Sequence, residues 1–257
     1  MTKSEFEQLL QQEATSMQEA VSTSNGDWIV KGFIDISKNI YTISADTKVI
    51  SKIMELLIFP RISAFASRNG LRWLPCSEQN FYPDITFIDN EGNKFAVDVK
   101  STYRKDADHV NGMTLGAFTG YFRNRNSTKN IMFPYDEYAG HFVLGLIYSR
   151  CEGIDEFEIH QLDDLENIQS VAKDFVFFAQ EKYKIAIDRP GSGNTKNIGG
   201  VTRIADLING NGIFSTMGEE VFDDYWMFYL TNDMAKAAEL PTPYYRNIEE
   251  YKEFKGI

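Results

Sequence analysis

The stretch FAVDVK at residues 95–100 decides the fold of this chain. Successive side chains of a β-strand point to opposite faces, so Ala96, Asp98 and Lys100 share one face and the large apolar residues between them share the other. This alternation, with a phenylalanine and two valines, is typical of a strand that has one face in a core. The strand therefore presents an acid and a lysine together, with Cα atoms about 6.5–7 Å apart.

A partner for this strand precedes it in the sequence. Residues 81–88 form a second β-rich segment, and the polar residues Asp89 to Asn93 between the two segments are typical of a hairpin turn. Asp84 follows a proline within the first segment. Pairing of the two segments brings the carboxylates of Asp84 and Asp98 within reach of one cation.

Two carboxylates beside an ammonium suit the hydrolysis of a phosphodiester. Mg²⁺ prefers hard oxygen ligands and binds through one or two carboxylates together with water and a substrate phosphate. It offsets charge on the phosphate and lowers the pKa of a bound water, while Lys100 can stabilise the transition state or orient the attacking water. Glu55 lies in an apolar run with helical spacing that Asp46 can cap, and it could supply a further ligand or position the water.

The pattern of carboxylates and lysine has an alternative explanation. Asp98 and Lys100 could lie on the solvated face of an amphipathic edge strand, because Pro-Asp followed by Asp-x-Lys recurs by chance in unrelated chains. The active-site interpretation is favoured because both halves of the pattern fall on β-rich segments joined by a turn.

The other segments predict an α/β (α+β) fold with a mixed central β-sheet flanked by helices. Residues 142–148 are apolar apart from Gly145, which indicates a buried strand. Pro60 should kink or divide the helix that begins near Asp46, and Gly70 should end it. The remaining expected elements are a helix within residues 1–25, a hairpin over 28–43, strands at 175–179 and 183–187, a loop over 190–200, and helices at 203–208 and 219–230.

The composition fits an ordinary globular protein. Of the 257 residues, 43% are hydrophobic and 25% are charged, so we expect one nuclease domain over 1–257, with 1–25 as an N-terminal helical extension and 231–257 as a C-terminal tail. No apolar run approaches the roughly 18 residues that span a bilayer, and the N-terminus is too polar for a secretory signal. Cys76 and Cys151 are too few for a disulfide framework or a cysteine-rich zinc site, which favours a cytoplasmic location.

The charge of the chain argues mildly against nucleic acid as a partner. The net charge is −11, whereas proteins that bind DNA neutralise phosphates with lysine and arginine. A basic cleft can nevertheless line an acidic protein. Arg123, Arg125 and Lys129 form a local basic cluster that could face DNA or lie on a solvated surface.

Four further segments resemble, in the same order, the type II restriction endonucleases of the EcoRV family, which belong to the PD-(D/E)xK nuclease superfamily. They are SADTKV at 44–49 followed by Glu55, QNFYPD at 79–84, TLG at 114–116 with NRNSTKNIMFP at 124–134, and GSGNTKNIG at 191–199. The last segment resembles the recognition loop of the family almost residue for residue, and it is far more specific than the catalytic pattern. The resemblance covers most of the chain, from about residue 40 to residue 226.

The resemblance implies roles for the matching positions alone. Asp84 and Asp98 would bind the metal, Lys100 would assist the water or phosphate, and Glu55 would be an auxiliary acidic residue and ligand. The implied DNA-binding residues are Thr47 and Lys48 at the DNA backbone or dimer side, Gln79 and Asn80 near the minor groove, Tyr103 and Lys129, and in the major groove Gly191, Ser192, Gly193, Asn194, Thr195 and Asn197.

The chemistry of the 191–199 segment agrees with a recognition role. Glycine lets the backbone approach base edges closely, an asparagine can pair with adenine, and the methyl group of a threonine can contact that of thymine. Without the family resemblance the same composition would be typical of a generic turn.

The resemblance also implies a function. It implies a homodimeric enzyme that reads a palindrome in double-stranded DNA, with one half-site for each subunit. It implies Mg²⁺-dependent cleavage at the centre of GATATC to leave blunt ends with 5′-phosphates, bending of the DNA at its flexible TA step, and an adenine DNA methyltransferase that protects host DNA. The chain departs from the family at Glu78, where a second glutamine is expected, and after Trp226, where arginines are expected.

Two other functions stay open at this point. A PD-(D/E)xK nuclease of DNA repair or junction cleavage would cut according to DNA structure and not sequence. A DNA-binding module without catalysis would keep the recognition loop but lack competent metal ligands, and the presence of Asp84, Asp98 and Lys100 argues against it.

Overall fold

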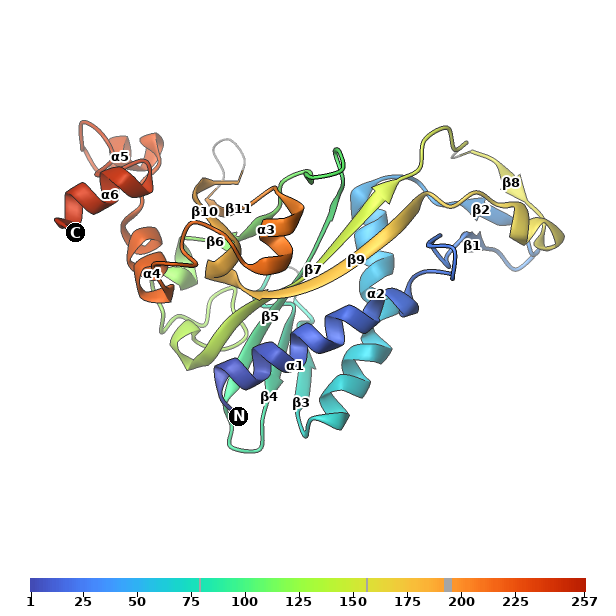
Figure 1. The fold of residues 1–257 in the computed structure, drawn as a ribbon, viewed down its shortest axis with the longest axis horizontal. Coiled ribbons are helices and arrows are strands. Elements are labelled where there is room, and N and C mark those ends of the chain that lie inside the picture. Colours follow the sequence, from blue (N-terminus) through green and yellow to red (C-terminus); the bar gives the residue numbers. More distant parts are fainter. Residues whose placement is uncertain (79, 156, 192–195) are drawn as a thin grey trace.

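A mixed five-stranded sheet forms the centre of the protein (Figure 1). The computed structural model describes residues 1–78, 80–155, 157–191 and 196–257. The strand order is β3-β4-β5-β7-β9; β5 and β7 run parallel and the other neighbours run antiparallel. The strands are β3 Arg72–Pro75, β4 Ile85–Ile88, β5 Lys94–Tyr103, β7 Tyr138–Arg150 and β9 Ala172–Glu181. The predicted mixed sheet flanked by helices is confirmed.

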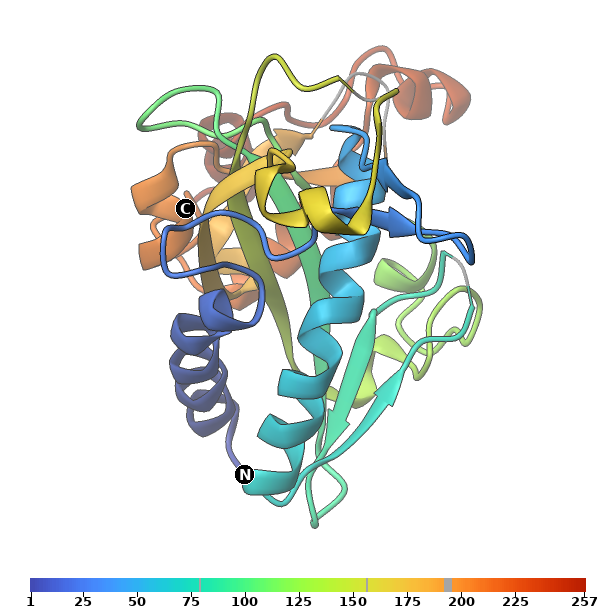
Figure 2. The same cartoon turned by 90° about the vertical axis from the view of Figure 1, so that its right-hand side faces the viewer.

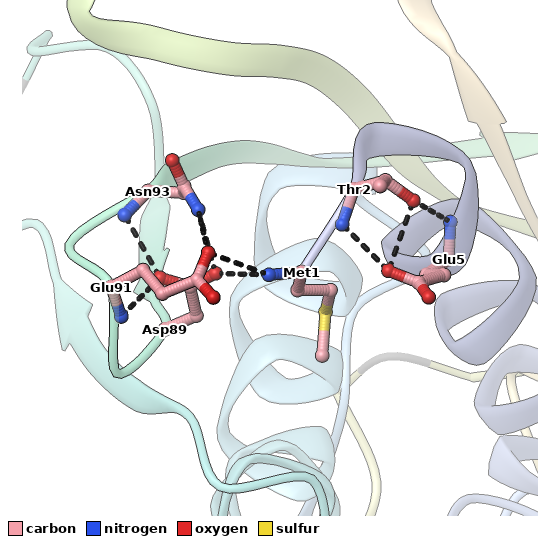
Figure 3. Close-up of polar contacts among 6 residues, drawn as sticks. All are labelled: Met1, Thr2, Glu5, Asp89, Glu91 and Asn93. Carbon is pink, nitrogen blue, oxygen red and sulfur yellow. Dashed lines mark hydrogen bonds and ion pairs between the residues drawn. The ribbon is translucent and has the colours of Figure 1, made fainter.

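The β4–β5 hairpin forms as predicted, and Asp89 organises its turn. The Asp89 carboxylate accepts hydrogen bonds from the backbone N–H groups of Glu91 and Asn93, both at 2.9 Å, and lies 2.7 Å from the Met1 ammonium (Figure 3). Strand β4 is shorter than predicted because the chain from residue 81 to 84 lies outside the regular ladder, which begins at Ile85.

Two helices, α1 Lys3–Ser16 and α2 Thr47–Arg68, cover one face of the main sheet (Figures 1 and 2). Phe6 of α1 stacks on Phe95 of β5, with ring centroids 4.3 Å apart and planes 5° apart. Asp46 caps α2 as predicted, because its carboxylate accepts from the N–H groups that begin the helix. Gly70, at φ +65, follows the end of α2 in the left-handed conformation that favours glycine.

A second core lies on the opposite face of the main sheet. Strands β6 Thr114–Ala117, β10 Ala186–Pro190 and β11 Asn197–Gly200 form a separate sheet in the order β10-β11-β6. Ala96, Val143, Ile147 and Phe178 of the main sheet belong to this core together with Trp226. Helices α3 Ile204–Asn209 and α4 Glu219–Phe228 contribute to it as well.

A long crossover connects the two parallel strands β5 and β7. Parallel strands begin at the same end of a sheet, so the chain must travel back along the face before it can start the second strand. The crossover spans residues 104–137 and contains β6 and the short 3₁₀ helices η2 Gly120–Phe122 and η3 Tyr135–Glu137. It passes over the face of the sheet that carries Asp98, because residues of both line one cavity.

Smaller elements lie at the two ends of the molecule in Figure 1. At one end β1 Gly32–Ile34, β2 Ile40–Thr42 and β8 Ile159–His160 form an antiparallel sheet, which confirms the predicted hairpin over 28–43. At the other end lie α5 Asn232–Ala237 and α6 Ile248–Lys255. The remaining 3₁₀ helices are η1 Met17–Ala20, η4 Leu162–Asn167 and η5 Lys182–Ile185.

Four segments differ from the prediction, besides the shorter β4. Residues 197–200, predicted as part of a loop, form β11. Helix α2 is not divided at Pro60, and its buried face runs through Ile50, Met54 and Ile58, while Leu56 is 57% exposed. Residues 183–185, predicted as part of a strand, belong to η5. The polar segment after residue 231 forms two helices, which buried tyrosines such as Tyr245 attach to the core.

Two simpler expectations agree with the structure. Both cysteines, Cys76 and Cys151, are free thiols. Within the described ranges, no helix has the length and apolar character needed to cross a membrane.

Candidate active site

Asp84, Asp98 and Lys100 converge as the sequence predicts. Ile85 pairs with Val97 in the β4–β5 ladder, so the next position of the same register places Asp84 opposite Asp98. The Nζ atom of Lys100 lies 2.7 Å from an oxygen of Asp98. All three side chains line one cavity of about 700 Å³.

A backbone hydrogen bond fixes the Asp84 carboxylate. The N–H group of Val99 donates to Oδ2 of Asp84 at 2.7 Å. Val99 lies between Asp98 and Lys100 on β5, so this bond ties the loop before β4 to the strand that carries the other two groups. Asp84 is therefore held beside Asp98 by the main chain as well as by strand pairing.

The two carboxylates repel each other. Burial and then the charge of Asp98 raise the pKa of Asp84 to about 7, although the Lys100 ammonium acts in the opposite direction. Burial alone would lower the pKa of Lys100, but the charges of Asp98 and Asp84 outweigh it and the pKa of Lys100 is raised. The site thus combines two partly buried acids with a lysine that stays protonated at neutral pH.

This pair of acids fits a divalent cation. Two neighbouring carboxylates offer the hard oxygen atoms that Mg²⁺ prefers, and the unfavourable repulsion between them is the interaction that a cation relieves. Among the described residues, no group of three or more His, Cys, Asp or Glu side chains is close enough to hold a metal. Asp84 and Asp98 would therefore be completed by water and substrate oxygen atoms.

Glu55 lies beside this centre but does not join it. Its carboxylate is 2.7 Å from the Lys52 ammonium, and it lines a neighbouring cavity of about 460 Å³. Asp84 lines both cavities. The helix thus places Glu55 near Asp84, and the charge of Glu55 acts with those of Asp98 and Asp84 to raise the pKa of Lys100.

The crossover and the ends of the predicted recognition loop form the wall of the active cavity. Of the predicted DNA-binding residues, Asn80, Lys129 and Asn197 line the cavity. Gly191 lies against Thr114 of this wall, where a Cβ atom on Gly191 would come within 2.7 Å of the threonine methyl group. Gln79, Ser192, Gly193, Asn194 and Thr195 lie outside the described residues.

Three other predicted DNA-binding residues lie away from this cavity. Thr47 begins α2, and Lys48 is an exposed residue in the first turn of the same helix. Tyr103 packs against the core on the α1–α2 side of the sheet, and the Arg150 guanidinium lies 3.6 Å from its ring centroid. None of the three is among the residues that line the cavity.

The basic cluster of the crossover divides into two roles. Arg123 donates to the backbone oxygens of Phe118 and Tyr229, and Arg125 lies 2.7 Å from a carboxylate oxygen of Asp223. These two arginines therefore hold α4 and its C-terminal end against the crossover, whereas Lys129 faces the cavity.

Sequence reasoning missed several residues of the wall. Tyr82, Thr119 and Tyr121 line the cavity, although they adjoin the segments that resemble the family and could have been found from them. Lys182, which is only 2% exposed, lies behind Tyr82 and carried no signal, because lysine is seldom buried and its neighbours come from distant segments.

Comparison with known proteins places this chain among restriction enzymes. A model of the family "Restriction endonuclease EcoRV" matches residues 24–256. The type II restriction enzyme EcoRV of Escherichia coli is 35% identical over 237 residues, which cover 91% of this chain and 93% of that protein. All of α1 precedes the range that the family model matches.

Proposed function

Because the chain belongs to the EcoRV family of type II restriction endonucleases, we propose that it hydrolyses double-stranded DNA with Mg²⁺ held by Asp84 and Asp98. The proposal rests on one observation: the same cavity is lined by these two acids, by Lys100 and by Asn197 of the predicted recognition loop. A single cavity can then hold the scissile phosphate while the adjoining loop contacts bases.

The residues of the cavity have different roles in hydrolysis. Mg²⁺, when bound, offsets charge on the phosphate and lowers the pKa of a bound water. The Val99 N–H group keeps the Asp84 carboxylate directed beside Asp98. Lys100, held by Asp98, donates to the attacking water or to a phosphate oxygen. In-line attack by water breaks the bond between phosphorus and the 3′-oxygen, which leaves a 5′-phosphate. Glu55 acts as an auxiliary acidic residue from the neighbouring cavity.

The proposed recognition site is GATATC, cut at its centre to give blunt ends. Asparagine in the 191–197 loop can pair with adenine and threonine can contact the thymine methyl group. A central TA step is easily deformed, so bending of the DNA adds sequence preference at bases that the protein does not touch.

We place the homodimer interface on the small β1–β2–β8 sheet. Large apolar side chains are exposed on and beside it, with Ile34 at 58%, Ile36 at 102% and Phe157 at 92%. Contiguous exposed apolar groups are typical of interaction surfaces. A second copy related by a two-fold axis would cover them, and two copies are what a palindromic site requires.

Two further proposals concern the partner enzyme of this endonuclease and the compartment in which it acts. A restriction endonuclease that cuts GATATC needs a partner adenine DNA methyltransferase, which protects the same sequence in the host genome. Both enzymes would act on DNA in the cytoplasm, and the free thiols of Cys76 and Cys151 agree with that reducing compartment.

Digestion of a plasmid of known sequence tests the function. In Mg²⁺, the wild-type protein should give discrete fragments, and sequencing of their ends should read a blunt cut within GATATC. Asp98→Ala should leave the plasmid whole. Intact plasmid in both digests would identify a DNA-binding module without catalysis, and a smear without discrete fragments would identify a nuclease that ignores sequence.

A further inference from the structure

Lys182 is a buried lysine directly behind the active cavity. It begins η5 after β9, and its side chain turns inward, whereas the neighbouring Glu181 and Lys184 form ion pairs with α1. Its Nζ atom lies 5.0 Å from the ring centroid of Tyr82, 5.6 Å from that of Phe122 and 5.9 Å from that of Tyr135. Within the described part of the chain, Nζ has no hydrogen-bond partner.

An unpaired buried ammonium is unfavourable for folding. Contacts with aromatic faces offset only part of the hydration free energy that the ammonium loses on burial. Burial lowers the pKa of Lys182 to about 8, with Asp98 and Asp223 acting to raise it and Lys100 and Arg125 to lower it. Proteins keep such costly groups mainly where function requires them. A methionine of similar length would fill the same space without the charge.

Gly116 connects Lys182 to the cavity. A Cβ atom on Gly116 would lie 3.4 Å from Nζ of Lys182 and 3.4 Å from the hydroxyl oxygen of Tyr121. Gly116 has φ +89, a conformation that excludes most side chains. The Lys182 ammonium and the Tyr121 hydroxyl therefore both lie beside Gly116, where a side chain would contact them. Gly116 and Tyr121 themselves line the cavity, next to Asp98 and Lys100.

Tyr121 is fixed as a hydrogen-bond donor. Its ring stacks on that of Tyr82, with centroids 5.2 Å apart and planes 13° apart. Burial and the charges of Asp98 and Asp84 raise the pKa of Tyr121, while a backbone hydrogen bond from Ala117 to the phenol oxygen acts in the opposite direction. The phenol therefore keeps its proton. A hydrogen bond from Ala117 to the phenol oxygen and the nearby Lys182 ammonium both disfavour placing the hydroxyl hydrogen towards them, which favours the direction of the cavity.

We propose that Tyr121 donates a hydrogen bond to a non-bridging oxygen of the DNA phosphate in the active cavity, and that Lys182 is a positioning residue that directs this donor. The inference rests on the proposed function, because it needs a phosphate in the cavity. In this proposal the buried Lys182 ammonium acts through Tyr121 and does not contact the substrate.

A double-mutant cycle on plasmid cleavage tests the proposal. Tyr121→Phe removes one oxygen and leaves the stack of rings, and it should lower kcat/KM by roughly ten- to a hundredfold, the usual effect of losing a hydrogen bond to a charged group. Lys182→Met should lower it by a smaller factor. The double variant should be no slower than Tyr121→Phe, because the lysine acts through the phenol.

Thermal unfolding separates a positioning role from a structural one. Lys182→Met should raise Tm, since it removes an unpaired buried charge, even though it slows cleavage. Lys184→Met is the matched control: it breaks ion pairs of 2.8 Å with Glu7 and 3.0 Å with Glu181, so it should lower Tm and leave cleavage unchanged at temperatures where the protein is folded.

Binding of DNA in Ca²⁺, followed by fluorescence anisotropy, should weaken in Tyr121→Phe but not in Lys184→Met.

These experiments distinguish failure of this inference from failure of the proposed function. If the wild-type enzyme leaves the plasmid whole in Mg²⁺, the proposed function fails and this inference fails with it. If the wild type cuts and Tyr121→Phe cuts at the same rate, only the inference is overturned. Multiplicative losses in the double variant, or a lower Tm in Lys182→Met, would overturn the positioning role of Lys182, and Tyr121→Phe would still test the phosphate contact.

Discussion

Phe6 of α1 lies flat against Phe95 of β5, with ring centroids 4.3 Å apart, on the face of the sheet opposite Asp98. Both rings are fully buried. The N-terminal helix α1, which precedes the region that the family model matches, therefore packs against the opposite face of the strand that carries Asp98 and Lys100. Helix α1 is therefore part of the hydrophobic core. Because it packs on the face of the sheet opposite the catalytic residues, its contribution to stability can be tested without changing the active site.

Phe6→Ala should destabilise the protein by about 3–5 kcal/mol, the usual cost of emptying a buried aromatic site. Urea unfolding followed by circular dichroism measures the change. Phe254→Ala, at a ring that is 51% exposed, is the control and should cost less than about 1 kcal/mol. Equal losses in the two variants would contradict a core role for α1.

Asp84→Ala, Asp98→Ala and Lys100→Ala should each abolish cleavage without unfolding the protein, because the three groups share one cavity around the phosphate. Glu55→Ala should slow cleavage less, since Glu55 lines the adjoining cavity. Rates of plasmid nicking, with circular dichroism as the check on folding, measure both effects. Any of the first three variants cutting at the wild-type rate would refute its catalytic assignment.

The contribution of Asp84 to stability in metal-free buffer should fall as pH rises towards neutrality. Asp84 has an ordinary pKa of 3.8 when unfolded and about 7 when folded, so between these values the unfolded state loses its proton first and gains stability relative to the folded state. Above pH 7 the penalty is complete. Asp84→Asn should therefore have a higher Tm than wild type at pH 8 in EDTA and a similar Tm at pH 4. A lower Tm for the variant at pH 8 would contradict the repulsion between Asp84 and Asp98.

Ile34→Asp should convert the proposed dimer into a monomer, because it puts a charge into the exposed apolar surface of the small sheet. Sedimentation velocity measures the change, and cleavage of both strands should be lost with the dimer. Tyr244→Asp is the control: it changes an exposed ring in the segment between α5 and α6, two helices that lie at the opposite end of the molecule (Figure 1), and it should remain dimeric. A monomeric wild-type protein would exclude this interface.

The sequence predicts the local parts of the site well. Alternation along residues 95–100 and the turn at Asp89 are short-range signals, and they suffice to bring Asp84 beside Asp98. The same alternation separates Tyr103 from the site: it lies five residues after Asp98, an odd step, and so its side chain belongs with Phe95 on the other face. Its predicted role at DNA stays a prediction, which would require DNA to reach this other face.

Long-range packing explains what the sequence does not predict. Lys182 lies behind the cavity because η5 packs against Phe122 of the crossover. Arg123 and Arg125 contact the C-terminal end of α4 and Asp223 of α4. The polar segment after residue 231 becomes helical because Tyr245 and Tyr251 find a core built by distant residues. None of these partners is close in sequence, so no local pattern reveals them.

The crossover between β5 and β7 gives the two walls of the cavity a different tolerance to changes in length. Asp98 and Lys100 stand on β5 and Asp84 immediately precedes β4, so a residue inserted in either strand would reverse which side chains face the cavity. The opposite wall comes from residues 114–130 of a connection that is held by β6 and by the contacts of Arg123 and Arg125. A change of length in a loop between these contacts would alter how a DNA duplex is held and would leave the strand register of the hydrolytic centre unchanged.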